Sequence, residues 1–325
     1  MASTLETCAN TGARPASPAL GDTLYQEDTN QIIVCANATG PVWKTYESNG
    51  ELAYPSGIYT EGTPYVISVQ PAMHFDASRI NGADASGNPA INGAVATWED
   101  RSGNGNDATQ GTAADQGAFV KMGGHFGIKM PTSTTLGMYA TGHTFASGSD
   151  GFTMVGAFGC PNTVYNTRPV NCARSGATTP ASWADAGIRV STTCEFALSH
   201  LAGNYSPSTL GATVSSAGPR IVSVSDGDGD QKLFEGQQVG FTGTTARSEA
   251  TIDDRLGGPW WLGYKPFGVA AGSGGGGIYN EILIFRNTVG YTVDGSGNLN
   301  GGDLNTVVEY LANKYGVETN PVMLR

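Results

Sequence analysis

Residues 95–110 read Val-Ala-Thr-Trp-Glu-Asp-Arg-Ser-Gly-Asn-Gly-Asn-Asp-Ala-Thr-Gln, and they say more about the fold than any other segment. The stretch begins with residues typical of the end of a β-strand, namely Val95, Thr97 and Trp98. The next segment, 102–107, consists only of Ser, Gly, Asn and Asp. Glycine adopts positive φ without steric cost, and Asn and Asp tolerate it while bonding to nearby backbone. The segment therefore predicts a strand that ends in a glycine–asparagine turn.

The composition of the whole chain favours a β-rich globular protein. Of the 325 residues, 47 are glycine and only 14% are charged, and strong helix formers are scarce. Many short strands joined by turn-rich loops fit this usage, and such strands build sandwiches or barrels. The hydrophobic fraction of 39% is enough for a sizeable core and argues against disorder.

Hydrophobic periodicity predicts the individual elements. We expect strands at 64–69, 152–160, 187–198, 220–225, 231–241, 260–264 and 277–286. The segments 220–225 and 231–236 face each other across a short acidic turn and predict a hairpin. One helix is expected at 303–315, because its apolar residues form a single stripe. Asp303 is the expected N-cap and Gly316 the expected C-terminal glycine of this helix.

Three further segments, taken in order with 95–110, resemble a known family. They are Phe75-Asp76-Ala77-Ser78-Arg79-Ile80, residues 277–285 and residues 307–317. Together these segments resemble the laminin-G-like branch of the concanavalin-A-like jelly rolls over roughly residues 70–318. The resemblance implies an all-β, two-sheet antiparallel jelly-roll sandwich with one C-terminal helix, which we assign to residues 61–325. It implies surface recognition and does not point to a reaction.

The first 60 residues predict a separate small β-hairpin module. Residues 23–25 and 31–35 read as two strands around a turn at 28–30. A hairpin of this size is marginally stable alone, so it should pack against something else. Residues 14–30 match Arg-Pro-x-Ser-Pro-x-x-Gly-Asp-x-x-Tyr-x-x-Asp-Thr-Asn, which resembles a short module of bacteriophage structural and fibre proteins. The resemblance implies an attachment module for residues 1–60.

Charge, hydropathy and cysteine usage exclude several classes of partner. The formal charge is −11 and no basic run occurs, so we expect no nucleic-acid partner. No apolar run is long enough to span a membrane, and the first residues lack the features of a signal peptide, so we expect synthesis in a host cytoplasm. The five cysteines predict free thiols. Cys160 and Cys172 could face each other if the residues between them form a hairpin.

No arrangement of catalytic residues is evident, so we expect neither an enzyme nor a cofactor. Glycoside hydrolysis needs two carboxylates facing one cleft, but Glu99-Asp100 and Asp253-Asp254 are adjacent and would point to opposite faces of a strand. Glu281 reads as a surface or hydrogen-bonded carboxylate. The four histidines have neither metal-ligand spacing nor a Gly-x-Ser-x-Gly partner, and read as loop or core residues; they are His74, His125, His143 and His200.

Two local features leave ligand alternatives open. Asp226, Asp228 and Asp230 resemble the start of a calcium loop, but Gln237 stands where that loop needs a bidentate Glu. We therefore prefer a hairpin turn with solvated acids and keep calcium as the alternative. Four aromatic residues are candidate sugar platforms, although core or subunit-interface roles compete; they are Trp183, Trp260, Trp261 and Tyr264. One of the adjacent tryptophans must point inward if the segment is a strand, and Trp98 is expected in the core.

These features together predict a non-enzymatic bacteriophage virion structural protein. We expect it on the particle surface as a head decoration or capsid fibre, rather than as a tail fibre. Its partners would be other virion proteins and further copies of itself in a trimer, with glycans as a further ligand. The alternative is a carbohydrate-binding or polysaccharide-degrading jelly-roll protein that acts on cell-surface glycans. A cellular adhesion protein is a third reading.

Overall fold

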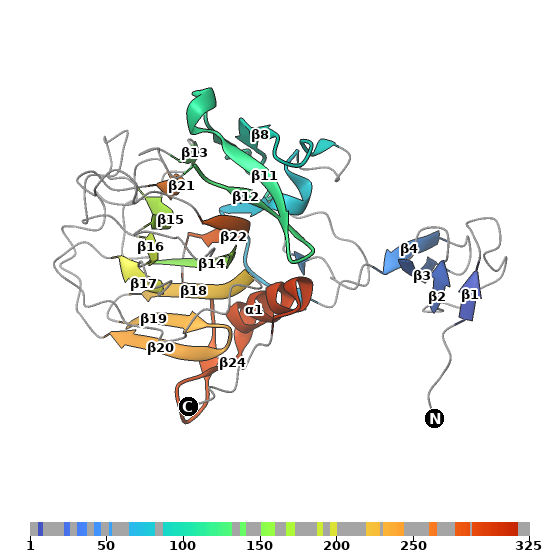
Figure 1. Ribbon diagram of the computed structural model, residues 1–325. Helices are drawn as coiled ribbons and strands as arrows, with labels where there is room; N and C mark the ends of the chain where they lie inside the picture. The colour runs from blue at the N-terminus through green and yellow to red at the C-terminus, as the bar shows by residue number, and fades with distance from the viewer. Residues whose placement is uncertain are drawn as a thin grey trace.

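The structure is a computed structural model of the 325-residue chain (Figure 1). It describes residues 6–8, 23–26, 31–37, 42–46, 52–53, 65–81, 87–131, 137–140, 151–159, 167–172, 187–190, 196–199, 219–227, 230–243, 260–264, 277–286 and 288–317.

Two antiparallel sheets form the body of the protein. The seven-stranded sheet has the order β17 (Phe196–Ser199), β16 (Gly187–Val190), β15 (Thr167–Cys172), β21 (Trp260–Tyr264), β13 (Met138–Ala140), β10 (Ala108–Thr109), β9 (Thr97–Trp98). The nine-stranded sheet has the order β20 (Gln238–Gly243), β19 (Asp230–Glu235), β18 (Pro219–Gly227), β14 (Phe152–Gly159), β22 (Ile278–Phe285), β12 (His125–Lys129), β11 (Gly117–Met122), β8 (Ala94–Val95), and β7 (Met73–Asp76) also pairs with β22. The predicted all-β antiparallel sandwich is confirmed.

The main core lies between these two sheets. Its buried residues come from both of them, including Trp98, Leu262 and Trp260 from one sheet and Phe75 and Ile282 from the other. Trp98 is completely buried, as expected, and its ring lies 5.5 Å from that of Phe75. Burying a side chain of this kind stabilises the fold by roughly 1.5–3 kcal/mol. The strands therefore alternate between this core and the two outer faces of the sandwich.

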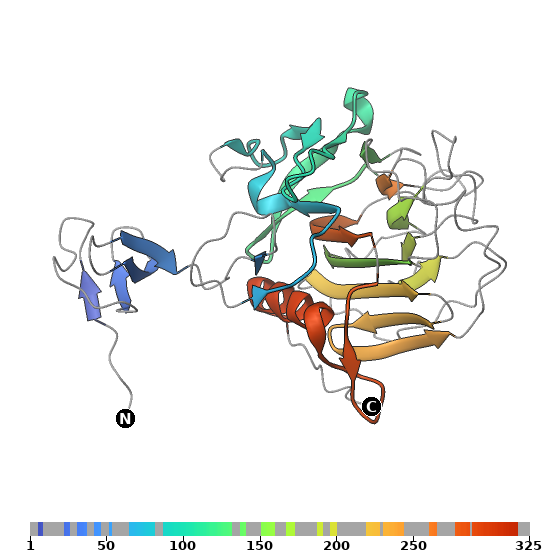
Figure 2. The same cartoon turned by 180° about the vertical axis from the view of Figure 1, so that it is seen from behind.

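The helix α1 (Gly302–Tyr315) covers the outer face of the nine-stranded sheet (Figures 1 and 2). The predicted apolar stripe is confirmed, because all of its members are buried: Leu304, Val307, Val308, Leu311 and Tyr315. Gly316 has φ 62° and ends the helix in the left-handed conformation, also as predicted. The prediction for Asp303 is wrong. The helix begins at Gly302, and the Asp303 carboxylate instead accepts hydrogen bonds from the backbone N–H and the hydroxyl of Ser68.

The glycine–asparagine turn forms where the sequence predicts it. Gly103 and Gly105 have φ of 85° and 72°, which only glycine adopts easily. The Asp100 carboxylate accepts hydrogen bonds from the backbone N–H groups of His74 and Asn106. The turn thereby fastens the end of β9 to the start of β7.

The N-terminal segment forms a small sheet of its own. It consists of β1 (Glu6–Cys8), β2 (Thr23–Gln26), β3 (Gln31–Asn37) and β4 (Val42–Tyr46), in that order. The predicted hairpin is confirmed as β2 and β3, and β4 extends it, while β1 pairs parallel to β2. Two short pairs complete the chain: β5 (Leu52–Ala53) with β6 (Tyr65–Val66), and β23 (Thr292–Val293) with β24 (Leu299–Gly301). The division at residue 60 stays a prediction.

Several local predictions need correction. The strand expected at 64–69 is limited to β6. The strand expected at 187–198 instead contains β16 and most of β17, and the one expected at 231–241 contains parts of β19 and β20. A hairpin between Cys160 and Cys172 is wrong, because β14 and β15 belong to different sheets. The predicted hairpin of 220–225 and 231–236 is confirmed as β18 and β19. The side chains of the five cysteines lie outside the described residues, as do those of Asp226, Asp228 and Asp230.

Candidate functional site

The first candidate site is a group of charged side chains under helix α1. Within β7, Met73 and Phe75 enter the core between the sheets, so His74 and Asp76 point to the opposite face. Glu281 lies directly across from Asp76 in the register of β7 and β22. Two carboxylates therefore share the face of the sheet that α1 covers.

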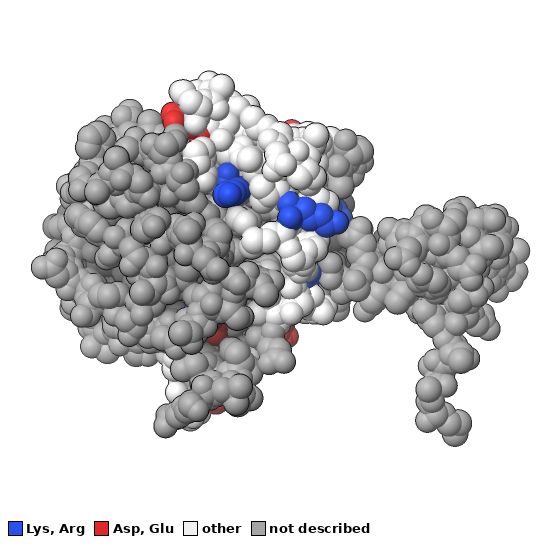
Figure 3. Space-filling view, in the orientation of Figure 1, with Lys and Arg blue, Asp and Glu red and all other residues white. Residues whose placement is uncertain are grey.

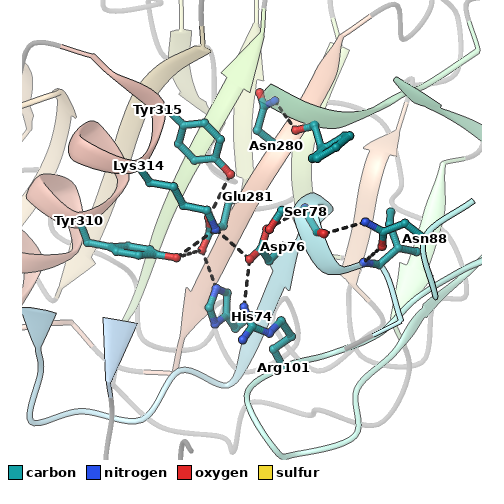
Figure 4. A network of polar contacts seen from close by, with 12 residues as sticks. His74, Asp76, Ser78, Asn88, Arg101, Asn280, Glu281, Tyr310, Lys314 and Tyr315 are labelled. Atoms are coloured by element: carbon teal, nitrogen blue, oxygen red, sulfur yellow. Dashed lines mark hydrogen bonds and ion pairs between the residues drawn. The ribbon is translucent and has the colours of Figure 1, made fainter. Parts of the chain in front are cut away.

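Glu281 is completely buried and its carboxylate is fully hydrogen-bonded (Figure 4). Its Oε1 lies 2.7 Å from Nε2 of His74 and accepts a hydrogen bond of 2.7 Å from the Tyr310 hydroxyl. Its Oε2 lies 2.6 Å from Nζ of Lys314 and accepts from the Tyr315 hydroxyl at 3.0 Å. Glu281 is thus a hydrogen-bonded carboxylate of the interior, one of the two roles that the sequence predicts for it.

Asp76 is equally well satisfied. Its Oδ1 accepts hydrogen bonds from the backbone N–H and the hydroxyl of Ser78. Its Oδ2 lies 2.9 Å from Nη1 of Arg101 and 2.8 Å from Nζ of Lys314. Lys314 therefore bridges both carboxylates, and each of the four carboxylate oxygens has two partners.

The charged groups of this network keep one another ionised by shifting each other's pKa values. Burial raises the pKa of Asp76, but the positive charges of Lys314 and Arg101 outweigh burial and hold the pKa well below its ordinary 3.8. Burial likewise raises the pKa of Glu281, and Lys314 brings it below the ordinary 4.5. Burial lowers the pKa of Lys314, yet Asp76 and Glu281 together raise it well above 10.5. Both carboxylates are ionised and the lysine is charged at neutral pH.

This network holds the fold together and offers no place for a substrate. Asp76 and Glu281 are 1% and 0% exposed, and their oxygens are already occupied. Burial and the nearby Glu281 charge raise the pKa values of Tyr310 and Tyr315 well above 10, so both phenols remain hydrogen-bond donors. The network joins β7, β22 and α1. Of the predicted histidines, His74 is a core residue and His125 is half-buried against the ring of Tyr315; His143 and His200 lie outside the described residues.

The second candidate site is the outer face of the seven-stranded sheet. Trp260 and Trp261 are adjacent in β21, so they point to opposite faces. Trp260 is completely buried in the core, where its ring lies 6.5 Å from that of Phe152. Trp261 points away from the core and its ring lies 5.1 Å from that of Tyr139, its neighbour across the strands. The structure thus decides which tryptophan of the pair faces inward.

The pair formed by Tyr139 and Trp261 presents an accessible ring. Tyr139 is 36% exposed, whereas Trp261 is 4% exposed and supports the tyrosine from the side. Thr109 lies opposite Tyr139 on β10, and its side chain is half-buried. Aromatic rings combined with hydroxyl groups give a surface with an apolar body and polar edges. The side chains of Trp183 and Tyr264, the other predicted sugar platforms, lie outside the described residues.

Two carboxylate residues flank the paired strands β9 and β10. Thr97 of β9 is opposite Thr109 of β10, and Trp98 is opposite Ala108. Glu99 directly follows β9, and Asp107 directly precedes β10. Among the described residues, no hydrogen bond or ion pair reaches the half-buried Glu99 carboxylate, whereas Asp107 accepts from the backbone N–H of Asp100 at 2.9 Å.

The described part of the chain gives little support for a metal site or for a basic binding surface. Within the described ranges, no group of three or more His, Cys, Asp or Glu side chains could hold a metal ion. On the face shown in Figure 3, the Lys and Arg side chains among the described residues are separate from one another. No described helix is long and apolar enough to cross a membrane. The absence of a nucleic-acid partner stays a prediction.

Comparison with known proteins identifies no family for this chain. No family model and no curated protein matches it. A Trypanosoma rangeli sialidase in complex with 2,3-difluorosialic acid aligns with 13% identity and a TM-score of 0.45, covering 75% of this chain and 33% of the sialidase. An arabinofuranosidase complexed with arabinofuranosyl-alpha-1,2-xylobiose aligns with 15% identity and a TM-score of 0.45, covering 69% of this chain and 52% of the enzyme. The chain therefore spans about a third to a half of these proteins.

These matches correct the functional prediction. The named proteins are glycosidases and not virion components, so the prediction of a non-enzymatic bacteriophage virion protein is wrong. Nothing among the comparisons supports the bacteriophage likeness of residues 14–30. The alternative, a protein that binds or degrades glycans, stays a prediction. Because identities and TM-scores are this low, no activity is carried over, and the function must be argued from the chain's own residues.

Proposed function

We propose that this chain is a carbohydrate-active protein of the laminin-G-like jelly-roll type. Its glycan would bind on the outer face of the seven-stranded sheet, around Tyr139 and Trp261. The observation that carries this proposal is the exposed ring of Tyr139, held at 5.1 Å from Trp261 on the side of the sheet that faces away from the core.

The chemistry of this face suits a sugar. The apolar C–H face of a pyranose packs against an aromatic ring, while its hydroxyl groups need nearby polar partners. Tyr139 supplies the ring and its own hydroxyl, and Thr109 supplies another hydroxyl from the neighbouring strand. A site with one aromatic platform and a few polar groups is the usual composition of a small-ligand site.

Hydrolysis of the bound glycan is a second candidate function. The observation that favours it is the Glu99 carboxylate, which is half-buried and receives no hydrogen bond or ion pair within the described residues. Asp107 directly precedes β10, the strand that pairs with β9, and Glu99 directly follows β9. Glycoside hydrolysis usually needs two carboxylates, one of which protonates the leaving group.

A single set of measurements tests both candidates. The full-length protein is applied to a glycan array, and the polysaccharides that bind are then assayed for release of reducing sugar. We expect Tyr139→Ala to weaken glycan binding about tenfold, which corresponds to roughly 1.4 kcal/mol. The matched control is Ile91→Ala, which removes an exposed apolar side chain, 50% exposed, from another part of the surface. Retention of full binding by Tyr139→Ala would place the ligand elsewhere and overturn the proposal.

A further inference from the structure

We propose that the tip of the hairpin formed by β11 and β12 is a pH-sensitive latch, which rests on the end of helix α1 at neutral pH and detaches in mild acid. The tip consists of residues 122–125, and the group that responds to pH is the imidazole of His125. This inference is independent of the proposed function, because it concerns the nine-stranded sheet. The latch would control the contact between this sheet and the helix that covers it.

The body of the hairpin is anchored directly beside its tip. His125 belongs to the last pair of β11 and β12 before the turn. The turn is Gly123-Gly124, whose φ values of 60° and 91° are typical of a tight two-residue hairpin turn. The next residue, Phe126, stacks on Phe119 at 5.2 Å, and its carbonyl oxygen accepts a hydrogen bond from the side-chain amide of Asn280. Detachment would therefore be confined to the tip.

The tip contacts α1 through two aromatic rings. The ring of His125 lies 5.2 Å from that of Tyr315 in an edge-to-face arrangement, beside the end of α1 (Figures 1 and 2). Tyr315 is buried and its hydroxyl donates to Glu281, so the phenol offers the imidazole a fixed surface. His125 itself is half-buried, so protons from the solvent can reach it.

Two ammonium groups flank this contact. Nζ of Lys314 lies 5.7 Å from the centre of the Tyr315 ring, so the ring that His125 contacts already has one positive charge beside it. Nζ of Lys121 lies 5.1 Å from the ring centre of Phe126, the residue next to His125. Charges repel one another when they lie within roughly one Debye length, about 10 Å at moderate salt. A proton on His125 would add a third positive charge to this group.

The remaining charged groups of the elements packed against β12 do not offset this repulsion. They are Lys129 of β12 itself, Arg79 of η2 (Ala77–Arg79), Glu281 of β22, and Asp303 and Glu309 of α1. Glu281 and its neighbour Asp76 already have Lys314 and Arg101 as counter-ions. Asp303 and Glu309 lie in earlier turns of the helix, where each accepts a hydrogen bond from another side chain.

Protonation therefore opposes docking of the tip. Burial lowers the pKa of His125 below its ordinary 6.5, and the positive charges of Lys121 and Lys314 lower it further. In the detached tip the imidazole escapes both burial and the two cations, so it binds a proton more readily. Docking is thus fully stable above pH 6.5 and is lost as the pH falls through the lower pKa of the docked state.

A histidine titration combined with hydrogen exchange tests the latch. The full-length protein, with isotopically labelled histidine rings, is titrated by NMR from about pH 7.5 to about pH 5, and His125→Gln assigns the resonance. We expect the pKa of His125 to lie below 6.5. Exchange rates are corrected for the intrinsic effect of pH, and we expect the protection of amides 121–125 to fall several-fold over this range while that of β14 stays constant. Asp76 and Glu281 remain ionised throughout, so their network does not contribute.

Variants separate the latch from a general effect of acid. Lys121→Gln removes one neighbouring charge, and we expect it to raise the pKa of His125 and to reduce the loss of protection. Lys129→Gln, at an exposed lysine further along β12, is the matched control and should change neither property. His125→Phe keeps a ring against Tyr315 but cannot be protonated, so the tip should stay protected down to about pH 5. A pKa of His125 at or above 6.5, protection that does not change with pH, or a loss of protection that persists in His125→Phe would each overturn the inference.

Discussion

Asp76 and Glu281 lie opposite each other on β7 and β22, and one ammonium group, that of Lys314, contacts both. Two carboxylates this close and this deeply buried would repel each other without a positive charge between them. The lysine comes from α1, so the helix supplies the charge that allows the two strands to pair with these residues in place. The contact links packing of the helix to pairing of the strands.

Replacement of Lys314 should therefore destabilise the protein strongly. Lys314→Met keeps the length of the side chain but leaves two buried carboxylates without their shared cation. Removal of one partner from a buried charge network typically costs about 3–5 kcal/mol, and we expect a loss of that size in the free energy of unfolding measured with urea. Lys129→Met, at an exposed lysine, is the control and should change little. A loss below roughly 1 kcal/mol would mean that the carboxylates find other partners.

Acid should weaken the same contact. The pKa values of Asp76 and Glu281 are lower in the folded protein than their ordinary 3.8 and 4.5. Their contribution to stability is therefore fully present above these ordinary values and is lost as the pH falls through the folded pKa values. We expect the stability difference between the unmodified chain and Asp76→Asn to be large at neutral pH and to shrink as the pH falls below 3.8 in urea unfolding. A difference that is constant across this range would contradict the network.

Two phenols should resist ionisation in alkali. The pKa values of Tyr310 and Tyr315 are raised well above 10 by burial and by Glu281, so both stay protonated while the protein is folded. In an absorbance titration, we expect a fraction of the tyrosine signal to appear only when the protein unfolds. The double variant Tyr310→Phe/Tyr315→Phe should lose this late fraction selectively. An unaltered late fraction would show that other tyrosines account for it.

A glycine beside β13 should be indispensable for the aromatic pair. A Cβ at Gly137 would collide with the carbonyl oxygen of Leu262, which belongs to the neighbouring strand β21. We expect Gly137→Ala to separate β13 from β21, to lower the melting temperature by several degrees, and to reduce glycan binding because Tyr139 would lose its position beside Trp261. Gly111→Ala, where a Cβ meets nothing within 4 Å, is the matched control and should leave both properties unchanged.

Turnover, where the reducing-sugar assay detects it, should depend on Glu99. A carboxylate that transfers a proton in the reaction contributes about 10²–10⁴-fold to the rate. Glu99→Gln should therefore lower the turnover rate by at least roughly 100-fold with little change in glycan affinity. Asp115→Asn alters another half-buried carboxylate, at a different place in the chain, and should retain the full rate. Full activity in Glu99→Gln would exclude this residue from the chemistry.

The sequence predicts well those features that depend on neighbours along the chain. The helix stripe, the β18–β19 hairpin and the turn at 102–107 each lie within one short segment, so periodicity and turn residues suffice to find them. Strand pairing between distant segments, such as β13 with β21, leaves no comparable local mark. For this reason the sequence predicts that one of Trp260 and Trp261 faces inward but does not identify which one.

The charged network was missed for the same reason. Its local signs are present, because His74 and Asp76 alternate with apolar residues in β7, and Glu281 interrupts the apolar strand β22. A buried carboxylate requires a partner. That partner, Lys314, is 238 positions away from Asp76, so only the folded structure identifies it.

The position of Lys314 also has a consequence for how the protein can be made. During synthesis the strands β7 and β22 leave the ribosome before the helix that neutralises them. Until residue 314 has emerged, burial of the carboxylates of Asp76 and Glu281 is unfavourable. The nascent chain should therefore remain only partly folded. Folding would then be completed in one late step, after the ammonium group of Lys314 has become available.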